Sequence, residues 1–349
     1  MMAKRVYVGL SGGVDSSLTT ALLKEQGYDV TAVYMKNWTK DLPGFKCPWQ
    51  QDFEDAKRVA VSLDVPFKVF DFEKDYRKKV VDYMIDGYKQ GITPNPDIIC
   101  NQEIKFKLFL STALKDGADL IATGHYARIK DGHLLTAKDK SKDQTYFLYR
   151  MPNESLDRVL MPIGNYLKTD VRREAKKRNL LTADKKDSQG ICFIGEVGIK
   201  EFLTEEIGPQ KIGEVIDENG KVIGRHEGAI FYTIGQRHGL NIGGGLPYYV
   251  TNKDMAKNQV FVTTNLDDNN LWKDKLNLTR FFFTYPNFDY ANNKLTAVCR
   301  YRAKGIDCQL TVNNQDALVI LKEPVRAISP GQSVVIYHKD LVVGGGIVV

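Results

Sequence analysis

Two cysteines, Cys100 and Cys192, stand in sequence settings where a thiol could do chemistry. Cys100 lies in the proline-rich segment Thr93–Asn101, three residues after Asp97 and just ahead of a predicted helix. A helix N-terminus lowers the pKa of a cysteine, and a nearby carboxylate can accept or return a proton. Taken alone, Cys100 fits a buried cysteine better. Cys192 lies in the polar segment Lys185–Gly195, whose lysines would stabilise a thiolate or a persulfide, and this setting does not suit a structural cysteine.

A glycine-rich turn near the N-terminus predicts a nucleotide site. Residues 11–17 read Ser-Gly-Gly-Val-Asp-Ser-Ser, follow the apolar run Val6–Leu10 and precede a helix-like pattern. Paired glycines let backbone amides approach a ligand, and a helix N-terminus favours an anion. No Gly-Lys-Ser/Thr ends the turn, so it is not a Walker A loop. It resembles the PP-loop of the ATP pyrophosphatases, which adenylate a substrate and release pyrophosphate. With two poised thiols, this predicts that ATP activates an oxygen that sulfur then replaces.

The elements around these residues alternate in the first half of the chain, which predicts an α/β fold with a parallel sheet. The strand-like runs are Val30–Met35, Phe67–Phe70 and Leu120–Thr123, and the helix-like runs are Phe53–Leu63, Lys74–Tyr88 and Ile104–Leu114. Ligands bind at the carboxyl ends of such strands, where Ser11, Met35 and Gly124 would lie. Asp131-Gly132 predicts a hairpin inserted at the edge of this domain.

The second half of the chain differs from the first in composition and in hydrophobic periodicity. Turn-rich, glycine-rich sequence begins near residue 195, and short alternating runs from about residue 271 onward predict a small β-barrel. We therefore expect three domains: a catalytic PP-loop domain at 1–200, a small central β-rich domain at 201–268, and a C-terminal β-barrel at 269–349.

Composition narrows the class of protein. The 349 residues are 43% hydrophobic and 26% charged, which is typical of a soluble globular chain. Five cysteines with no Cys-x-x-Cys pair argue against a disulfide framework or a standard zinc site. The absence of a leader or a membrane-length apolar run predicts a cytoplasmic protein without membrane contact. The basic run 168–186 is either a polyanion footprint or a solvated helix face, and charge alone does not separate these.

Taken together, the motifs resemble the bacterial tRNA-specific 2-thiouridylases, the MnmA family of the PP-loop superfamily. Besides the PP-loop, the resemblance rests on Met35–Trp38, Thr93–Phe106, Ala122–Tyr126, Lys142–Leu148, Asp187–Gly195, Gly235–Arg237, Arg300–Arg302, Ser329–Gln332 and Gly344–Ile347, which span nearly the whole chain. It implies a sulfurtransferase that uses ATP, with Mg²⁺ expected, to adenylate the carbon-2 carbonyl of the wobble uridine. Sulfur from a cysteine persulfide then gives 2-thiouridine, AMP and pyrophosphate.

The resemblance also implies roles for individual residues. ATP would lie on Gly9, Leu10, Ser11, Gly12, Gly13, Val14, Asp15, Ser16, Met35 and Gly124. Asn95, Pro96 and Asp97 would surround the uridine beside His125, and the tRNA contacts would be Lys142, Asp143, Gln144, Arg300, Tyr301 and Gln332, extended by the basic run. Cys192 would carry the persulfide, and Asp97 would serve as acid and base. Cys100 would either free hydrosulfide or close a disulfide with Cys192.

The resemblance implies two partners. The first is tRNA, namely the tRNAs for Lys, Glu and Gln, and the second is an upstream persulfide donor or relay protein.

Three alternatives stay open. In the first, Cys100, Cys192 and a third ligand hold an iron–sulfur cluster, which their spacing does not favour. A synthetase that adenylates a carboxylate would need no paired thiols. A tRNA-binding module with a degenerate ATP site is disfavoured by the intact Ser11–Ser16 motif. Cys299 and Cys308 are expected to be packing residues, and the role of Cys47 is left open.

Overall fold

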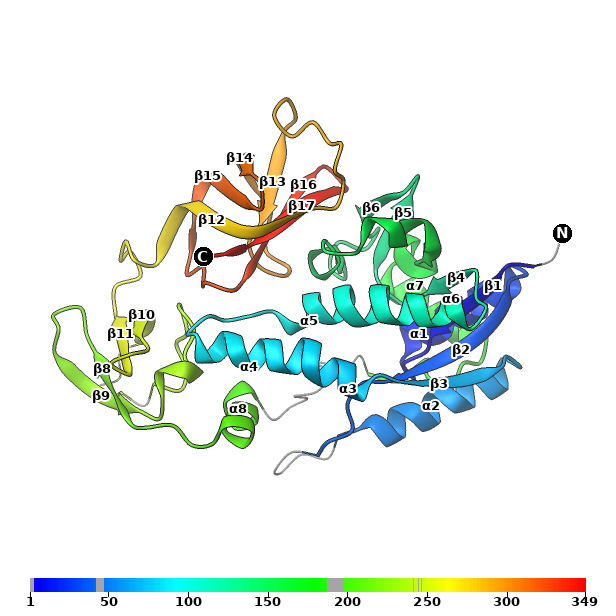
Figure 1. Ribbon diagram of the computed structural model, residues 1–349, viewed down its shortest axis with the longest axis horizontal. Helices are drawn as coiled ribbons and strands as arrows, with labels where there is room; N and C mark the ends of the chain where they lie inside the picture. The colour runs from blue at the N-terminus through cyan, green and yellow to red at the C-terminus, as the bar shows by residue number, and fades with distance from the viewer. Residues whose placement is uncertain (1–2, 42–46, 187–197, 241, 244, 246) are drawn as a thin grey trace.

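The computed structural model describes residues 3–41, 47–186, 198–240, 242–243, 245 and 247–349. The first domain is built on a five-stranded parallel sheet with the strand order β3-β2-β1-β4-β7 (Figure 1). Its strands are β1 (Arg5–Gly9), β2 (Asp29–Lys36), β3 (Phe67–Asp71), β4 (Leu120–Ala122) and β7 (Val159–Leu160). The predicted α/β fold with a parallel sheet is confirmed.

The order of the strands changes direction beside β1. The chain runs from β1 through α1 (Val14–Glu25) to β2 on one side, and β4 joins β1 from the other side. The strand order therefore reverses between β1 and β4, and the carboxyl ends of both strands face the place where open α/β sheets bind ligands. The helices α2 (Trp49–Ser62) and α7 (Lys168–Lys177) complete this region, and α7 packs against α1.

Two long helical segments run side by side between the sheet and the rest of the molecule (Figure 1). The first joins α3 (Glu73–Tyr76), the π-helical η1 (Arg77–Val81) and α4 (Asp82–Lys89). The second joins α5 (Pro96–Ile99), the π-helical η2 (Cys100–Phe109) and α6 (Leu110–Lys115). Helices were expected here, but the π-helical turns were not. Wide turns of this kind are rare and frequent at functional sites, and η2 begins at Cys100.

The remaining short helices are η3 (Thr145–Phe147), η4 (Asn153–Arg158), η5 (Pro162–Asn165) and η6 (Ala229–Phe231). The central region contains α8 (Ile199–Ile207) and a four-stranded sheet in the order β10-β11-β8-β9. Its strands are β8 (Gly213–Ile216), β9 (Val222–His226), β10 (Tyr249–Asp254) and β11 (Gln259–Thr263). Within the described ranges, no helix is both long and apolar enough to cross a membrane.

The C-terminal strands close into a barrel, as expected. They are β12 (Trp272–Phe283), β13 (Leu295–Val298), β14 (Ile306–Asn313), β15 (Asp316–Arg326), β16 (Ser333–His338) and β17 (Leu341–Val348). β12 pairs with both β15 and β17, which completes the ring. Near its end, a Cβ on Gly345 would lie 2.9 Å from the ring of Tyr149, so this glycine lets the first domain pack against the barrel.

The predicted hairpin exists, but its neighbour differs from the expectation. β5 (Ala127–Lys130) and β6 (His133–Thr136) form the hairpin, and β6 pairs with β17 through Leu135 and Leu341. The hairpin therefore extends the barrel sheet rather than lying at the edge of the first domain. A strand edge left unpaired will accept another strand, and sequence spacing does not say which edge is near.

Candidate active site

The turn 11–17 joins β1 to α1, and its own side chains fix its shape. The Ser16 hydroxyl donates to the Gly13 carbonyl at 3.1 Å, and the Ser17 hydroxyl donates to the same carbonyl at 2.8 Å. The Ser11 amide donates to the Ser16 oxygen at 3.2 Å. These hydroxyls therefore help to fix the shape of the turn. Among the described residues no side chain caps α1, so its first amides are available to an anion.

Two glycines allow the turn to sit where it does. Gly12 has a φ of +75°, and a Cβ there would collide with the carbonyl of Asp52 in α2. A Cβ on Gly124 would lie 2.7 Å from the amide nitrogen of Ser16. The turn is thus held between α2 and the loop after β4. Met35 also reaches it, since its methyl carbon lies 3.0 Å from the Cβ position of Gly9. The structure therefore brings the predicted nucleotide residues together.

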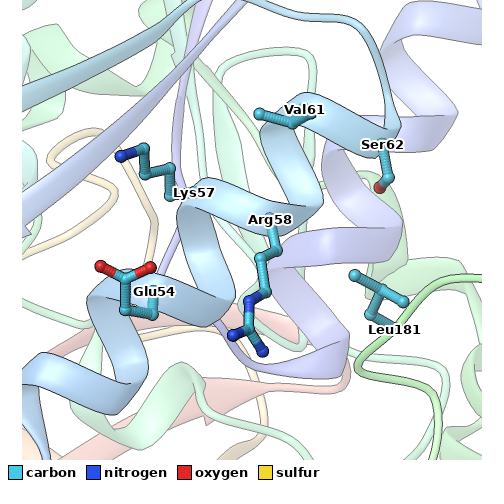
Figure 2. A pocket seen from close by; sticks show the side chains of 6 residues that line it. All are labelled: Glu54, Lys57, Arg58, Val61, Ser62 and Leu181. Atoms are coloured by element: carbon cyan, nitrogen blue, oxygen red, sulfur yellow. The ribbon is translucent and has the colours of Figure 1, made fainter.

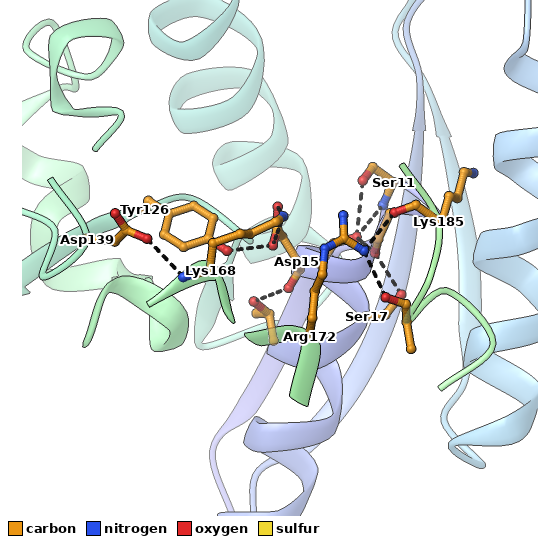
Figure 3. Close-up of polar contacts among 12 residues, drawn as sticks. Ser11, Asp15, Ser17, Tyr126, Asp139, Lys168, Arg172 and Lys185 are labelled. Atoms are coloured by element: carbon orange, nitrogen blue, oxygen red, sulfur yellow. Dashed lines mark hydrogen bonds and ion pairs between the residues drawn. The ribbon is translucent and has the colours of Figure 1, made fainter. Parts of the chain in front are cut away.

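Asp15, in the first turn of α1, meets partners that the motif did not reveal. The Lys168 ammonium donates to both carboxylate oxygens of Asp15 at 2.8 Å, and the Tyr126 hydroxyl donates to one of them at 2.8 Å (Figure 3). The Lys168 ammonium also lies 5.6 Å from the centroid of the Tyr126 ring. Lys168 appeared in the sequence only as the first member of a basic run. No spacing in the sequence relates it to Asp15.

Other members of the basic run are also engaged inside the protein. Arg172 donates to the carbonyls of Ala183 and Lys185 at 2.8 and 3.0 Å (Figure 3). The Lys185 ammonium pairs with Asp52 and Asp55 of α2 at 2.8 and 2.7 Å. These contacts weaken the interpretation of the run as a polyanion footprint, because Lys168 and Lys185 are already paired with carboxylates on α1 and α2. Cys192 and the rest of 187–197 lie outside the described residues.

Cys100 stands near the start of the second helical segment, as predicted. The Asn95 side chain caps this segment by accepting from the Asp97 amide at 3.2 Å, and Pro96 occupies the first helical position. Cys100 itself is 5% exposed and belongs to the core cluster between the two helical segments. The neighbouring Asn101 amide donates to the Phe147 carbonyl at 3.1 Å. In this conformation the thiol is covered.

Asp97, Lys105 and His125 form an electrostatic group beside Cys100. Burial raises the pKa of Asp97, and the nearby Lys105 opposes part of that rise. Burial, together with Lys105, holds the pKa of His125 well below its ordinary value, so the imidazole is neutral. Its Nε2 lies 3.4 Å from the Lys105 ammonium and its Nδ1 lies 2.8 Å from the Thr123 hydroxyl. Because an ammonium only donates, Nδ1 carries the imidazole proton. Sequence reasoning missed Lys105.

Several residues predicted to contact tRNA make bonds within the protein. Asp143 accepts from the amides of Ala137 and Thr145, and Gln144 accepts from the Tyr126 amide at 2.9 Å. These contacts shape the loop 137–145, which follows the hairpin. Lys142 lies on the same loop, half-buried.

The barrel residues predicted to contact tRNA behave similarly. Arg300 donates to the carbonyls of Arg326 and Ala327, and burial lowers its pKa. Tyr301 packs against Phe147, with 4.4 Å between ring centroids. A cavity of about 290 Å³ lies between the barrel and the loop 137–145. Its lining includes Lys140, Asp143, Tyr301, Arg302 and Lys339, which are polar, cationic and aromatic groups suited to RNA.

Thr93 is the point where the barrel and the central region contact the segment that leads to Asn95. Gln332 donates to the Thr93 carbonyl at 2.7 Å, and the Thr93 amide donates to the Pro330 carbonyl at 2.8 Å. The Thr93 and Thr233 hydroxyl oxygens lie 3.1 Å apart. Gly331, at a φ of +91°, lies so close that a Cβ would be 2.9 Å from the Thr93 backbone. The predicted tRNA residue Gln332 therefore anchors the segment that leads to Asn95.

A second cavity, of about 380 Å³, is separate from all of these residues. It lies on the outer face of α2, and its lining comprises Glu54, Lys57, Arg58, Val61, Ser62 and Leu181 (Figure 2). None of the residues predicted to be functional lines it.

The other described cysteines have environments that disfavour thiolates. Burial raises the pKa of Cys47, and its thiol lies 3.8 Å from the Trp38 carbonyl. Burial likewise raises the pKa of Cys299 to about 11 and that of Cys308 to about 12. Cys299 belongs to the barrel core and Cys308 packs against it, as expected for packing residues. In the ranges that the structure describes, no group of three or more His, Cys, Asp or Glu side chains could hold a metal ion.

Family models and curated relatives match the chain along almost its whole length. The model described as tRNA methyl transferase HUP domain matches residues 4–196, tRNA methyl transferase PRC-barrel domain matches 200–264, and Aminomethyltransferase beta-barrel domain matches 273–348. Proteins named tRNA-specific 2-thiouridylase MnmA, from Listeria monocytogenes, Staphylococcus epidermidis and Bacillus licheniformis, are each 47% identical to the chain. Each alignment covers 98% of this chain and 94% of the relative.

Proposed function

Because the chain belongs to the tRNA-specific 2-thiouridylase family, we propose that it uses ATP to replace the carbon-2 oxygen of a tRNA uridine with sulfur. The observation that carries this proposal is that 98% of the chain aligns with curated 2-thiouridylases at 47% identity. The reaction needs a nucleotide site and a reactive thiol in one crevice, and the arrangement of the described residues agrees with that need.

A short series of contacts links the nucleotide turn to the cysteine. Gly124 lies against Ser16 at the start of α1, and His125 follows it in the chain. His125 contacts Lys105, which belongs to the same π-helical segment as Cys100. The turn that would hold ATP and the helix that carries the thiol are therefore linked through Gly124, His125 and Lys105.

In the first step, the wobble uridine is turned out of the anticodon stack, because its carbonyl is unreachable while stacked. Its O2 attacks the α-phosphorus of ATP. The O2–P bond forms, the bond from that phosphorus to pyrophosphate breaks, and the electron pair leaves with pyrophosphate. Asp97 takes the N3 proton of the uridine, and burial, which raises the pKa of this carboxyl, makes its carboxylate a better base.

In the second step, the terminal sulfur of a Cys192 persulfide attacks carbon 2, and AMP leaves with the oxygen. Cys100, as thiolate, then attacks the Sγ of Cys192. The sulfur–sulfur bond breaks, its electron pair stays on the sulfur at carbon 2, and Asp97 returns the proton to N3. The products are 2-thiouridine and a Cys100–Cys192 disulfide, which a two-electron thiol reductant must reset. Alternatively, Cys100 attacks first and frees hydrosulfide, which then attacks carbon 2.

Mg²⁺ is the metal implied by this use of ATP. Proteins usually hold Mg²⁺ through one or two carboxylates together with substrate phosphates, and Asp15 at the start of α1 offers such a carboxylate. When bound there, the ion would neutralise phosphate charge.

We also propose that tRNA, with those for Lys, Glu and Gln as the candidates, lies across the cavity between the barrel and the loop 137–145. Tyr301 lines this cavity, and Lys142 belongs to the loop beside it. A tRNA substrate implies a cytoplasmic reaction. The expected domains at 1–200, 201–268 and 269–349 would then divide ATP chemistry, a connecting role and RNA contact among them. A persulfide donor or relay protein would load Cys192.

The test is nucleoside mass spectrometry on unmodified tRNA after incubation with the protein, ATP, Mg²⁺ and inorganic polysulfide. We expect a uridine in which sulfur replaces oxygen, formed only with ATP. Cys100→Ser and Cys192→Ser should abolish the product, whereas Cys308→Ser, a matched change in the barrel, should not. Pyrophosphate release without 2-thiouridine would reject the sulfur transfer, and full activity of the first two variants would reject the roles of both thiols.

A further inference from the structure

The carboxylate of the nucleotide turn already accepts three hydrogen bonds in this structure. Asp15 accepts from Lys168 through both oxygens and from the Tyr126 hydroxyl through one. The Lys168 side chain is 12% exposed, and that of Asp15 is 30% exposed. A lysine this well covered loses side-chain freedom and hydration, so its position needs a reason beyond a surface ion pair.

Lys168 reaches Asp15 from a separate element. It is the first residue of α7, and α7 packs on α1 through Val171 and Ala175, which share a core cluster with Leu18 and Leu22 of α1. The ammonium therefore lies beside the first turn of α1, where the amides face an anion. A lysine side chain is a flexible point charge with three donors, so it can pass from a carboxylate to a phosphate without movement of its helix.

We propose that Lys168 is a further catalytic residue of the adenylation step, in which its ammonium passes from Asp15 to the oxygens of the departing pyrophosphate. This inference rests on the proposed function. As the uridine O2 bonds to the α-phosphorus, the bond to the β-phosphate oxygen breaks and its electron pair stays on pyrophosphate. Lys168 donates hydrogen bonds to that growing negative charge and transfers no proton. Groups aimed at charge that develops in the transition state give the largest rate effects.

Asp139 is the positioning residue for this lysine. Its carboxylate accepts from the Lys168 amide at 2.9 Å and so fixes the start of α7. The same carboxylate accepts from the amide and hydroxyl of Ser141 at 3.0 and 2.7 Å. Asp139 belongs to the loop 137–145, which also carries Lys142.

The same end of that loop is attached to the barrel. The Thr136 amide donates to the Asp340 carbonyl at 2.8 Å, and the Lys140 ammonium pairs with the Asp340 carboxylate at 2.7 Å. One loop therefore touches the barrel, the cavity proposed for RNA and the helix that presents Lys168. The position of Lys168 is therefore fixed by the same loop, 137–145, that would contact bound tRNA.

Titration of the full-length protein with inorganic pyrophosphate tests the role of Lys168 directly. Lys168→Ala should weaken pyrophosphate binding by about tenfold to a hundredfold, since it removes a charge-assisted hydrogen bond. Lys168→Arg should retain most of the affinity. Lys177→Ala removes the same charge from the exposed far end of α7 and should change the affinity less than twofold. Thermal midpoints and tRNA affinity near those of the parent would show that the Lys168 variants are folded.

Pyrophosphate release from ATP and tRNA separates this inference from the proposed function. If the parent protein releases pyrophosphate and forms 2-thiouridine but Lys168→Ala matches it in rate and in pyrophosphate affinity, the inference is wrong and the function stands. Asp139→Ala should also weaken pyrophosphate binding, but the double variant with Lys168→Ala should be no weaker than Lys168→Ala alone, because Asp139 acts through Lys168. Additive losses would refute the positioning role.

Discussion

Replacement of Gly124 by alanine gives the sharpest test of how the nucleotide turn is built. The new Cβ would lie 2.7 Å from the Ser16 nitrogen, 2.8 Å from the Asp15 carbonyl carbon and 3.0 Å from the Ser16 Cα. All three are backbone atoms, so no side chain can rotate away. Ordinary contact begins at 3.4 Å, and the first turn of α1 and the loop after β4 must therefore separate by about 0.7 Å.

That displacement has two measurable consequences. Overpacking of a close backbone contact costs about 1–3 kcal/mol, which should lower the thermal midpoint by several degrees. A misplacement approaching 1 Å reduces rates by up to about a hundredfold, so pyrophosphate release should fall at least tenfold. The Cys100 thiol lies on another element, so the variant should behave as the parent does there: the thiol should resist a maleimide in the folded protein and react with it after unfolding.

The matched control is Gly224→Ala in β9 of the central region. There the nearest atom to the new Cβ is the Cγ1 of Ile242 at 3.4 Å, an ordinary contact with a side chain. This variant should resemble the parent in thermal midpoint and in pyrophosphate release. If Gly124→Ala releases pyrophosphate within twofold of the parent, the turn does not depend on this contact and the reasoning fails.

Three further predictions concern the anchoring of the site. Gln332→Ala removes the hydrogen bond to the Thr93 carbonyl, so it should slow 2-thiouridine formation several-fold without changing pyrophosphate affinity. Gln309→Ala, an exposed change in β14, should leave both the rate and the affinity unchanged. Equal effects of the two variants would refute the role of Gln332 as an anchor. Burial depresses the pKa of His125 in the folded state, so below about pH 6.5 the unfolded chain binds more protons than the folded chain. The thermal midpoint should therefore fall as the pH drops from 7 to 5, and His125→Gln should lessen that fall. If the variant loses as many degrees over this pH range as the parent, the buried neutral imidazole is refuted. Asp340→Ala breaks the ion pairs to Arg128 and Lys140 and should speed amide hydrogen exchange in residues 127–143. Exchange in β1 serves as the internal control. Unaltered exchange in 127–143 would show that these ion pairs do not hold the hairpin against the barrel.

Local patterns made much of the site predictable. The Ser11–Ser17 turn, the helix that starts near Cys100 and the hairpin at Asp131-Gly132 each depend on neighbours within a few residues, and all three form as expected. The order of alternating runs likewise predicts a parallel sheet with its ligand-binding edge at the ends of β1 and β4.

The tertiary contacts of those elements could not be predicted from the sequence. The sequence by itself determined the parallel sheet, the barrel, the turn at 11–17 and the helix that carries Cys100, because each follows from residue type at short spacing. Only the tertiary structure decided that Lys168 meets Asp15, that Gln332 holds Thr93 and that the hairpin joins β17. Pairs separated by 150 residues or more leave no periodic trace, since the energy of an ion pair or a strand edge depends on distance in space, which the folding of the whole chain sets.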